Sequence, residues 1–428
     1  MLPRYADIII DISHEAIDRP FQYRIPDGLR EDIRLGSMVK IPFGRGNHLR
    51  TGYVIGFSDQ TEYQPDRIKE ISELCDRSVP VEGRLLALAA WIRENYGSTM
   101  INAIRTVMPV KKTIRQLVDQ VVVLAENMDT EHLADIREQY HRKHAQAKLR
   151  LLQALEETPE RYLSMDVVKQ KWNISPATLK TMQQDGVITV ISKERYRTAG
   201  VYDYKENFQI TLNNEQQAVV DEVTGDMEQG RQKTYLLHGI TGSGKTEVYV
   251  KIVKKTIEMG KQAIILIPEI ALTYQTVRYF RNYFGDRVTI INSRLSDGEK
   301  YDQFMRAKNG DVDVVIGPRS ALFAPFQNLG IIIIDEEHET SYKSDYPPKY
   351  HARETAVKRA ELEHASVLLG SATPSVESYH RALNGTYRLL ELHERAGSGQ
   401  LAKTSIVDLR KELKAGNRSI TVSYTHLT

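Results

Sequence analysis

The pattern of apolar and polar positions divides the chain into three parts. From Asp7 to about Phe57, short apolar runs alternate with glycine-containing turns, which predicts a small β-barrel or sandwich. The predicted strands are Ile8 to Ile12, Phe21 to Ile25, Met38 to Phe43 and Gly52 to Phe57. An apolar stripe at helical spacing then predicts an amphipathic helix from Val81 to Tyr96, which we expect to pack on the barrel.

The middle of the chain carries shorter and more charged elements. It predicts a strand from Leu117 to Leu124, a charged connector or helix from Glu131 to Lys148, three short helices and a hairpin. The helices span Ala145 to Glu157, Ser164 to Trp172 and Ser175 to Gln184, and the hairpin spans Val187 to Arg197. This is a winged-helix arrangement, whose third helix can enter a DNA groove. Because Lys180 is its one cation between Thr178 and Gln184, a protein-contact or spacer role is the alternative.

From about Gln209 the pattern changes to strands alternating with helices. The strands are apolar on both faces, which predicts a parallel α/β sheet covered by helices on each side. They are Tyr235 to Leu237, Ala263 to Ile267, Val288 to Ile291, Val312 to Ile316, Ile331 to Ile334 and Ser366 to Leu369. Ligands of such sheets bind beyond the carboxyl ends of the strands, so the motifs that follow these runs are the candidates for chemistry.

Composition adds limits rather than a function. The 428 residues predict roughly three domains of about 150 residues each. A net charge of +2 neither demands nor excludes nucleic acid. The single cysteine, Cys75, excludes an internal disulfide framework and a cysteine-based zinc site within the chain. The charged N-terminus and the lack of a membrane-length apolar run predict a cytoplasmic protein with no membrane partner.

A phosphate-binding loop follows the first strand of the α/β part. Gly239 to Thr246 matches G-x-x-x-x-G-K-[ST], with Gly239, Gly242 and Gly244 at positions that let backbone N–H groups close around a phosphate. Lys245 would reach the terminal phosphates of ATP and Thr246 would hold Mg²⁺. The alternative is a chance glycine turn, which the order of strand, loop and helix disfavours.

Two carboxylates follow the apolar strand Ile331 to Ile334. Asp335 would orient Mg²⁺ through its water shell, and Glu336 would act as the general base that polarises the attacking water. Acidic residues are also common surface caps after strands. Their place downstream of a phosphate loop favours the hydrolytic role.

Two loops combine cations with aromatic or flexible residues. In Tyr342 to His351, three tyrosines can stack on bases while two lysines hold phosphate, and interdomain packing is the alternative. In Gly44 to Arg50, basic side chains lie beside Phe43 and Tyr53, and a solvated hairpin is an equal alternative. The residues concerned are Tyr342, Lys343, Tyr346, Lys349, Tyr350, Gly44, Arg45 and Arg50. Arg319 and Arg353 are further candidates for backbone contact, although Arg353 also suits an ordinary helix-surface charge.

The motifs resemble a known family. Asp335 to His338 followed by Gly370 to Pro374 resembles motifs II and III of superfamily 2 helicases. Further segments resemble the primosomal protein N′ (PriA) family of replication-restart helicases, and the first two of them resemble its 3′-DNA-end-binding domain. These segments are Arg19 to Tyr23, Val39 to Arg50, Leu212 to Gln216, Ile267 to Ile270, Gly317 to Phe323 and the aromatic stretch after His338. The resemblance covers nearly the whole chain.

The resemblance implies roles for individual residues. Gln216 would contact adenine, Ser371 and Thr373 would couple the nucleotide state to DNA, and Arg319 and Ser320 would lie on the DNA track. A pocket for a nascent 3′ end would be lined by Phe21, Gly44 and Lys69. Two positions depart from the family pattern: Gln22 stands where an acid is common, and Asn292 stands where histidine is common.

The resemblance also implies an organisation and an activity. We expect a 3′-DNA-end-binding β domain at 1–110, a winged-helix domain with connector at 111–200, a RecA-like helicase lobe at 201–412, and a linker with a non-native tail at 413–428. A second lobe and a zinc module would lie outside this N-terminal fragment. The implied activity is ATP-dependent 3′-to-5′ unwinding at stalled forks. Its partners would be branched and single-stranded DNA, primosome proteins and single-stranded-DNA-binding protein. The alternative is a DNA- and nucleotide-binding module without motor activity.

Overall fold

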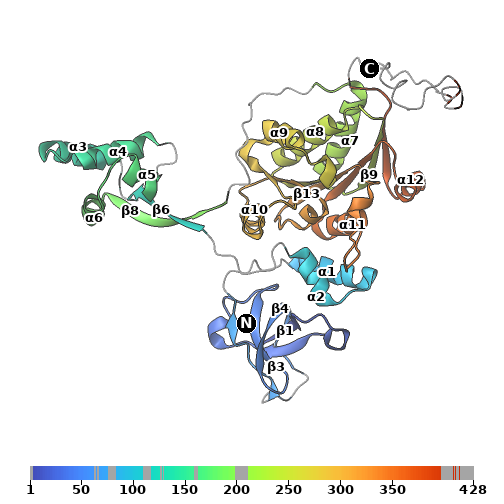
Figure 1. The fold of residues 1–428 in the computed structure, drawn as a ribbon, viewed down its shortest axis with the longest axis horizontal. Coiled ribbons are helices and arrows are strands. Elements are labelled where there is room, and N and C mark those ends of the chain that lie inside the picture. Colours follow the sequence, from blue (N-terminus) through green and yellow to red (C-terminus); the bar gives the residue numbers. More distant parts are fainter. Residues whose placement is uncertain are drawn as a thin grey trace.

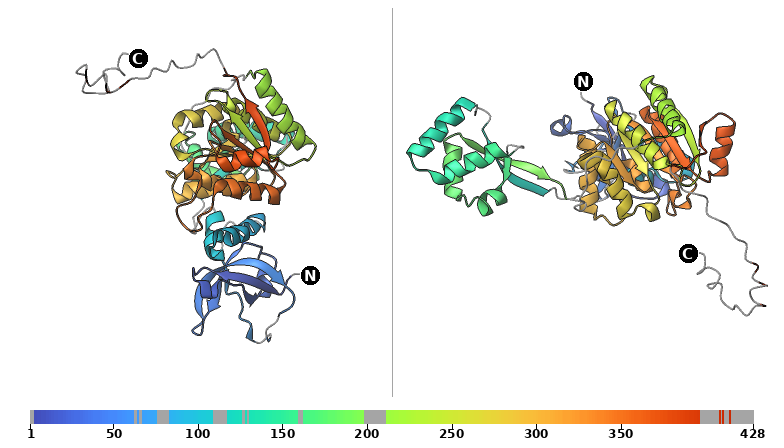
Figure 2. Two further views of the ribbon diagram at one scale, coloured as in Figure 1. Left: turned by 90° about the vertical axis from the view of Figure 1, so that its right-hand side faces the viewer. Right: turned by 90° about the horizontal axis from the view of Figure 1, so that it is seen from above.

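The computed structural model describes residues 3–61, 64, 67–75, 83–108, 117–125, 128, 130–158, 162–197, 211–396, 408, 410 and 414. These residues form an N-terminal β unit with two helices, a middle unit that stands apart in Figure 1 and in the right view of Figure 2, and a large α/β unit. The predicted boundaries near 110, 200 and 412 lie outside the described residues, as does the predicted tail except Lys414. Among the described helices, none combines the length and apolar character needed to span a bilayer.

The N-terminal unit is the antiparallel β fold that the sequence predicts. Its sheet has the strand order β2-β1-β4-β3-β5 and encloses an aliphatic core around Ile8, Ile41 and Val54. A backbone bridge between Arg24 of β2 and Glu70, just before β5, brings the two edges of the sheet together into a small barrel. The strands are β1 (Tyr5–Ile10), β2 (Phe21–Arg24), β3 (Met38–Phe43), β4 (His48–Ser58) and β5 (Glu73–Leu74). Because β4 begins at His48, Arg50 belongs to this strand and the polar turn after β3 is shorter than predicted.

Two helices join the β unit to the α/β unit. α1 (Gly83–Tyr96) packs against α2 (Met100–Val107) and against α11 (Ala352–Glu363) of the α/β unit. One hydrophobic cluster includes Tyr53 of the barrel, Leu88 of α1 and Ala356 of α11. The α1 helix therefore packs between the barrel and the α/β unit rather than on the barrel alone, as seen in Figure 1.

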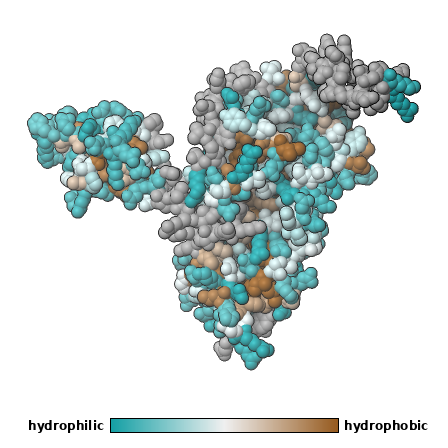
Figure 3. All heavy atoms as spheres, viewed as in Figure 1, coloured by the Kyte–Doolittle hydropathy of each residue, from teal (hydrophilic) through white to brown (hydrophobic). Residues whose placement is uncertain are grey.

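The middle unit contains helices and a small antiparallel sheet of order β7-β6-β8. Its elements are β6 (Leu117–Leu124), α3 (Thr130–Arg142), α4 (Gln146–Glu157), β7 (Tyr162–Ser164), α5 (Met165–Gln170), α6 (Pro176–Gln184) and β8 (Ile188–Arg195). The predicted hairpin at Val187 to Arg197 is wrong: β8 is one strand that pairs with β6 along its whole length. Alternation identifies a strand but not its partner. The surface of this unit is mainly hydrophilic in Figure 3.

The α/β unit is a parallel sheet of seven strands in the order β11-β12-β10-β13-β14-β9-β15. The strands are β9 (Thr234–Gly239), β10 (Gln262–Leu266), β11 (Val288–Ile290), β12 (Val314–Gly317), β13 (Leu329–Asp335), β14 (Ser366–Ser371) and β15 (Arg388–Leu392). The predicted fold class is confirmed. The strand β15 was not predicted, because two of its five residues are charged and weaken the apolar pattern.

Helices cover both faces of this sheet. One apolar cluster lies under α7 (Asn214–Glu228), α8 (Lys245–Glu258) and α9 (Tyr274–Phe284). The other lies under α10 (Asp297–Asn309), α11 and α12 (Val376–Leu383). The carboxyl ends of β9 and β13 lead into the phosphate loop and the acidic motif, with β14 between these two strands.

Candidate nucleotide and DNA sites

The phosphate loop turns sharply between β9 and α8. Gly242 and Gly244 have φ of 79° and 78°, in the left-handed region that favours glycine. A Cβ on Gly239 would lie 2.6 Å from Ser243 Oγ. Lys245 is buried, and its Nζ donates a hydrogen bond to the Gly239 carbonyl at 2.9 Å. The loop therefore encloses the lysine amine with its own backbone.

The side chain of Gln216 holds the phosphate loop by a hydrogen bond. Its Nε2 donates to the Ser243 carbonyl at 2.9 Å, and its Oε1 accepts from the Asn213 N–H at 2.9 Å. The side chain is 2% exposed, and a Cβ on Gly244 would come within 2.2 Å of Nε2. In this structure the amide links α7 to the loop. The adenine contact that the resemblance implies stays a prediction.

The acidic motif ends β13 beside the loop. Tyr249 on α8 donates a hydrogen bond from its hydroxyl to Asp335 Oδ1 at 3.0 Å. Burial, with the neighbouring Glu336 charge, raises the pKa of Asp335 to about 6, although the Tyr249 hydrogen bond opposes the shift. Glu336 itself has φ of 46°, an uncommon backbone conformation that ends the strand abruptly.

One pocket brings the predicted magnesium residues together. Its volume is about 350 Å³, and Thr246, Tyr249 and Asp335 all line it. Mg²⁺ prefers oxygen ligands and is commonly held by one or two carboxylates together with substrate phosphates. A threonine hydroxyl and a carboxylate beside a phosphate loop fit that ion.

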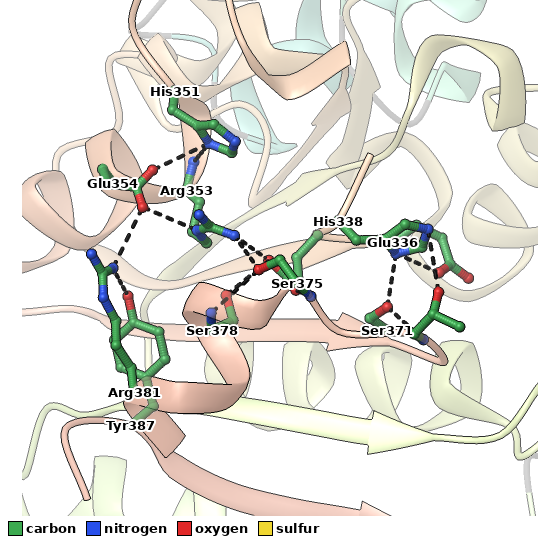
Figure 4. Close-up of polar contacts among 12 residues, drawn as sticks. Glu336, His338, His351, Arg353, Glu354, Ser371, Ser375, Ser378, Arg381 and Tyr387 are labelled. Carbon is green, nitrogen blue, oxygen red and sulfur yellow. Dashed lines mark hydrogen bonds and ion pairs between the residues drawn. The ribbon is translucent and has the colours of Figure 1, made fainter. Parts of the chain in front are cut away.

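His338 connects the acidic motif with the Gly370 to Pro374 motif, as Figure 4 shows. Its Nδ1 lies 2.8 Å from Ser371 Oγ and 3.6 Å from Glu336 Oε2. Its Nε2 lies 3.5 Å from Thr373 Oγ1. The residues predicted to couple nucleotide state to DNA therefore meet at one histidine. His338 is part of the Asp335 to His338 motif, but the sequence alone assigns it no role.

The third acid of the motif lies in the core. Glu337 is fully buried and accepts hydrogen bonds from Arg353 Nη1 at 2.8 Å, from the Ser375 N–H at 2.6 Å and from Ser378 Oγ at 2.9 Å. Burial alone would raise the pKa of Glu337, but these donors, first of all Arg353, hold it below its ordinary value. Arg353 is 6% exposed, so it is neither a surface charge nor open to a DNA backbone (Figure 4).

In the aromatic loop, Tyr342 to His351, not all of the tyrosines predicted to stack on bases face outward. Tyr342 is 1% exposed, and its hydroxyl donates to the carbonyls of Leu266 and Asp335 at 3.0 Å and 2.7 Å. Tyr350 is also buried and packs edge-on against Phe323. Of these three tyrosines, only Tyr346, 78% exposed, has its ring open to solvent. The spacing of tyrosines in a loop does not reveal which ones support it.

The remaining predicted residues of the DNA track lie around this loop. Lys343, Lys349 and Ser320 are exposed. Arg319 donates to the Ser341 carbonyl at 3.1 Å and also to the Lys343 carbonyl, so it holds the loop in place. Arg319, Ser320, Asn292 and Tyr342 line a second pocket of about 420 Å³.

A third pocket, of about 750 Å³, lies on the N-terminal sheet. It brings together Phe21, Gly44, Arg45 and Lys69, whereas Arg50 does not line it. Lys69 Nζ donates to the Gly44 carbonyl at 2.8 Å, and Phe21 packs edge-on against Phe43. The full lining is Arg19, Phe21, Gln22, Tyr23, Phe43, Gly44, Arg45, Gln64, Arg67, Ile68 and Lys69. It contains four cations and no acid, which suits a phosphate-bearing ligand.

This fold, a parallel α/β unit with a phosphate loop joined to an N-terminal β unit, is of the helicase type. Residues 213–382 match the DEAD/DEAH box helicase family, and residues 7–109 match the 3′DNA-binding domain (3′BD) of PriA. A helicase domain of this class uses nucleotide and Mg²⁺.

The particular similarity is to replication restart protein PriA. The chain is 35% identical to that of Bacillus subtilis over 97% of this chain and 59% of the relative. It is 32% identical to that of Chlamydia muridarum over 98% of this chain and 56% of the relative. The resemblance inferred from the motifs is thereby confirmed, and the chain spans somewhat more than half the length of these relatives. The solved structure of RecG bound to a three-way DNA junction aligns with 45% of this chain and 25% of its own, at 26% identity and a TM-score of 0.35.

Proposed function

We propose that this chain acts in an ATP-dependent DNA helicase of replication restart, with 3′-to-5′ polarity, on stalled forks in the cytoplasm. The observation that carries the proposal is the pairing, in one chain, of a phosphate loop facing Asp335 with a cation-lined pocket on the N-terminal sheet. The first suits nucleotide hydrolysis, and the second suits a DNA end. The likeness to PriA relatives supports their joint use.

In the nucleotide site, the proposed roles follow from position. The loop N–H groups and Lys245 would bind the phosphates, and Thr246 and Asp335 would hold Mg²⁺. Glu336 would orient and deprotonate the attacking water. Mg²⁺ supplies charge neutralisation of the phosphates when bound, while the chain positions the reacting groups.

In the DNA sites, the proposed contacts use exposed groups. Tyr346 would stack on a base and Lys343 and Lys349 would hold phosphates. In the N-terminal pocket, Gln22 Oε1 is buried and has no hydrogen-bond partner among the described residues, so it would be able to accept a bond from a terminal 3′-hydroxyl. Primosome proteins and single-stranded-DNA-binding protein are proposed partners, and zinc is proposed only for a part of the protein outside this chain.

Replacing the phosphate-loop lysine tests the nucleotide role. Lys245→Ala should reduce DNA-stimulated ATP turnover by at least about 100-fold, because the terminal phosphates lose a positioned cation. Forked DNA should bind with unchanged affinity, since Lys245 lies in the α/β unit away from the N-terminal pocket. ATP turnover by phosphate release and fork binding by fluorescence anisotropy measure the two effects. A variant that hydrolyses ATP at the parent rate would refute the assignment.

A second candidate function is a fork- and nucleotide-binding module that has no motor activity. One observation favours this candidate: every described residue that lines the metal pocket belongs to the α/β unit. An arginine finger from another lobe can change turnover by orders of magnitude. DNA-stimulated turnover with strand separation by this chain alone would exclude the second candidate. Nucleotide and fork binding without turnover would favour it.

A further inference from the structure

The hydroxyl of Tyr249 lies at the wall of the candidate metal pocket. Tyr249 follows Thr246 by three positions on α8, so the two side chains lie on the same side of the helix. Tyr249 is 1% exposed, and its hydroxyl donates to Asp335 Oδ1 at 3.0 Å. The pocket is therefore lined by the Thr246 hydroxyl, the Asp335 carboxylate and the Tyr249 phenol that donates to this carboxylate.

The strand next to Asp335 leaves space for this phenol. The register of β13 and β14 places Gly370 directly opposite Asp335. A Cβ added to Gly370 would lie 1.7 Å from the Tyr249 hydroxyl oxygen. Any side chain larger than hydrogen at Gly370 would therefore push the hydroxyl away from the carboxylate. The close approach of Tyr249 therefore explains why a glycine occupies position 370, which the sequence of the Gly370 to Pro374 motif does not reveal.

We propose that Tyr249 is a positioning residue that fixes the Asp335 carboxylate in the orientation used to bind the metal. This inference rests on the proposed nucleotide function of the same pocket. A carboxylate can rotate about its bond to Cβ, and a single buried donor fixes the plane of its oxygens. Groups that orient metal-binding side chains in this way typically change metal affinity about 10-fold to 100-fold when they are removed.

The chain offers a matched control for loss of a buried phenol. Tyr235 on β9 is fully buried, and its hydroxyl donates to Asp226 Oδ2 at 2.8 Å. This Tyr–Asp pair joins α7 to β9 and lines none of the three pockets described above. Tyr249→Phe and Tyr235→Phe therefore remove the same buried hydroxyl from two carboxylates, of which only Asp335 faces the metal pocket.

The experiment measures metal binding rather than turnover. Mn²⁺, a spectroscopic substitute for Mg²⁺, is titrated into the full chain with saturating ADP, and free Mn²⁺ is measured by electron paramagnetic resonance. We expect Tyr249→Phe to weaken Mn²⁺ binding about 10-fold. Tyr235→Phe should bind Mn²⁺ like the parent. ADP affinity in the presence of a chelator should be equal in all three proteins.

Three results would overturn the inference in distinguishable ways. Folded Tyr249→Phe that binds Mn²⁺ as tightly as the parent shows that the hydroxyl does not position Asp335. Equal weakening in Tyr235→Phe shows an effect of general packing. A parent chain that binds no ADP overturns the proposed nucleotide site itself, and with it the role of Tyr249.

Discussion

At the scale of single residues, Asp335 combines two opposed properties. Its position at the end of a buried strand raises its pKa to about 6, and a metal carboxylate acts only when it is ionised. The ionised form is favoured by the Tyr249 hydroxyl and by the cation Lys245. Below about pH 6, part of the free energy of metal binding is therefore used to remove the proton from this acid.

This balance predicts a pH-dependent metal affinity. Because Asp335 has a raised pKa, it is mostly protonated below about pH 6, and a protonated carboxyl is a poor ligand. The half-saturating Mg²⁺ concentration for ADP binding should rise by up to about 10-fold per pH unit as the pH falls from 6 to 5, and change little between 7 and 8. Isothermal titration calorimetry at each pH measures it. In Asp335→Asn, the half-saturating Mg²⁺ concentration should vary with pH only through protonation of the ADP phosphates. If the parent shows the same pH profile as Asp335→Asn, the prediction is wrong.

At the scale of elements, α11 holds several functional segments in place. Arg353 at its first turn binds Glu337 of the acidic motif. Arg359, one to two turns later, is fully buried and donates to the carbonyls of Leu322 and Ala324, which follow Arg319 and Ser320. One helix therefore supports the acidic motif and part of the proposed DNA track.

Removing the arginine should leave a buried charge without its partner. Arg353→Met should lower the free energy of unfolding by about 3–5 kcal/mol, because Glu337 then remains ionised in the core or must take up a proton. Chemical denaturation at neutral pH measures the loss. The double variant Arg353→Met with Glu337→Gln should lose less than the single variant, since the charge itself is gone. A single variant as stable as the parent would show that the ion pair adds nothing.

Features that depend on a single strand or helix could be predicted from the sequence, whereas contacts between elements distant in the sequence could not. The loop from Gly239 to Thr246 and the acids after Ile334 could be placed, because apolar strands define where each begins. The burial of Tyr342, Tyr350 and Arg353 could not, since it depends on contacts with β10, with η6 (Arg319–Phe323) and with Ser375, the N-cap of α12. The role of Tyr249 likewise depends on its proximity to two strands distant in sequence.

At the scale of the whole molecule, one apolar cluster joins residues of the first and third predicted domains. This cluster runs from the N-terminal barrel through α1 and α2 into the α/β sheet. The middle unit has a separate cluster that includes Leu152 and Val122. Its end is tied to α10 by the Arg197 backbone N–H, which donates to Asp302 Oδ2 at 2.7 Å. The barrel and the α/β unit therefore share a core that the middle unit lacks.

This division predicts two thermal transitions. Leu152→Ala, a fully buried change in the middle unit, should cost about 2–5 kcal/mol and lower only one transition in differential scanning calorimetry. Ile92→Ala, a fully buried change on α1, should lower the other transition, which the barrel and the α/β unit share. If Leu152→Ala lowers both transitions equally, the units unfold as one.

The position of Lys245 also has a consequence for ligand choice. Its amine has three N–H donors, and the bond to the Gly239 carbonyl uses one of them. The other two donors can bind the β- and γ-phosphates while that bond keeps the amine in place. AMP ends before those phosphates, so it would gain less from this lysine than ADP or ATP. The contribution of Lys245 to affinity should therefore grow with the length of the phosphate chain.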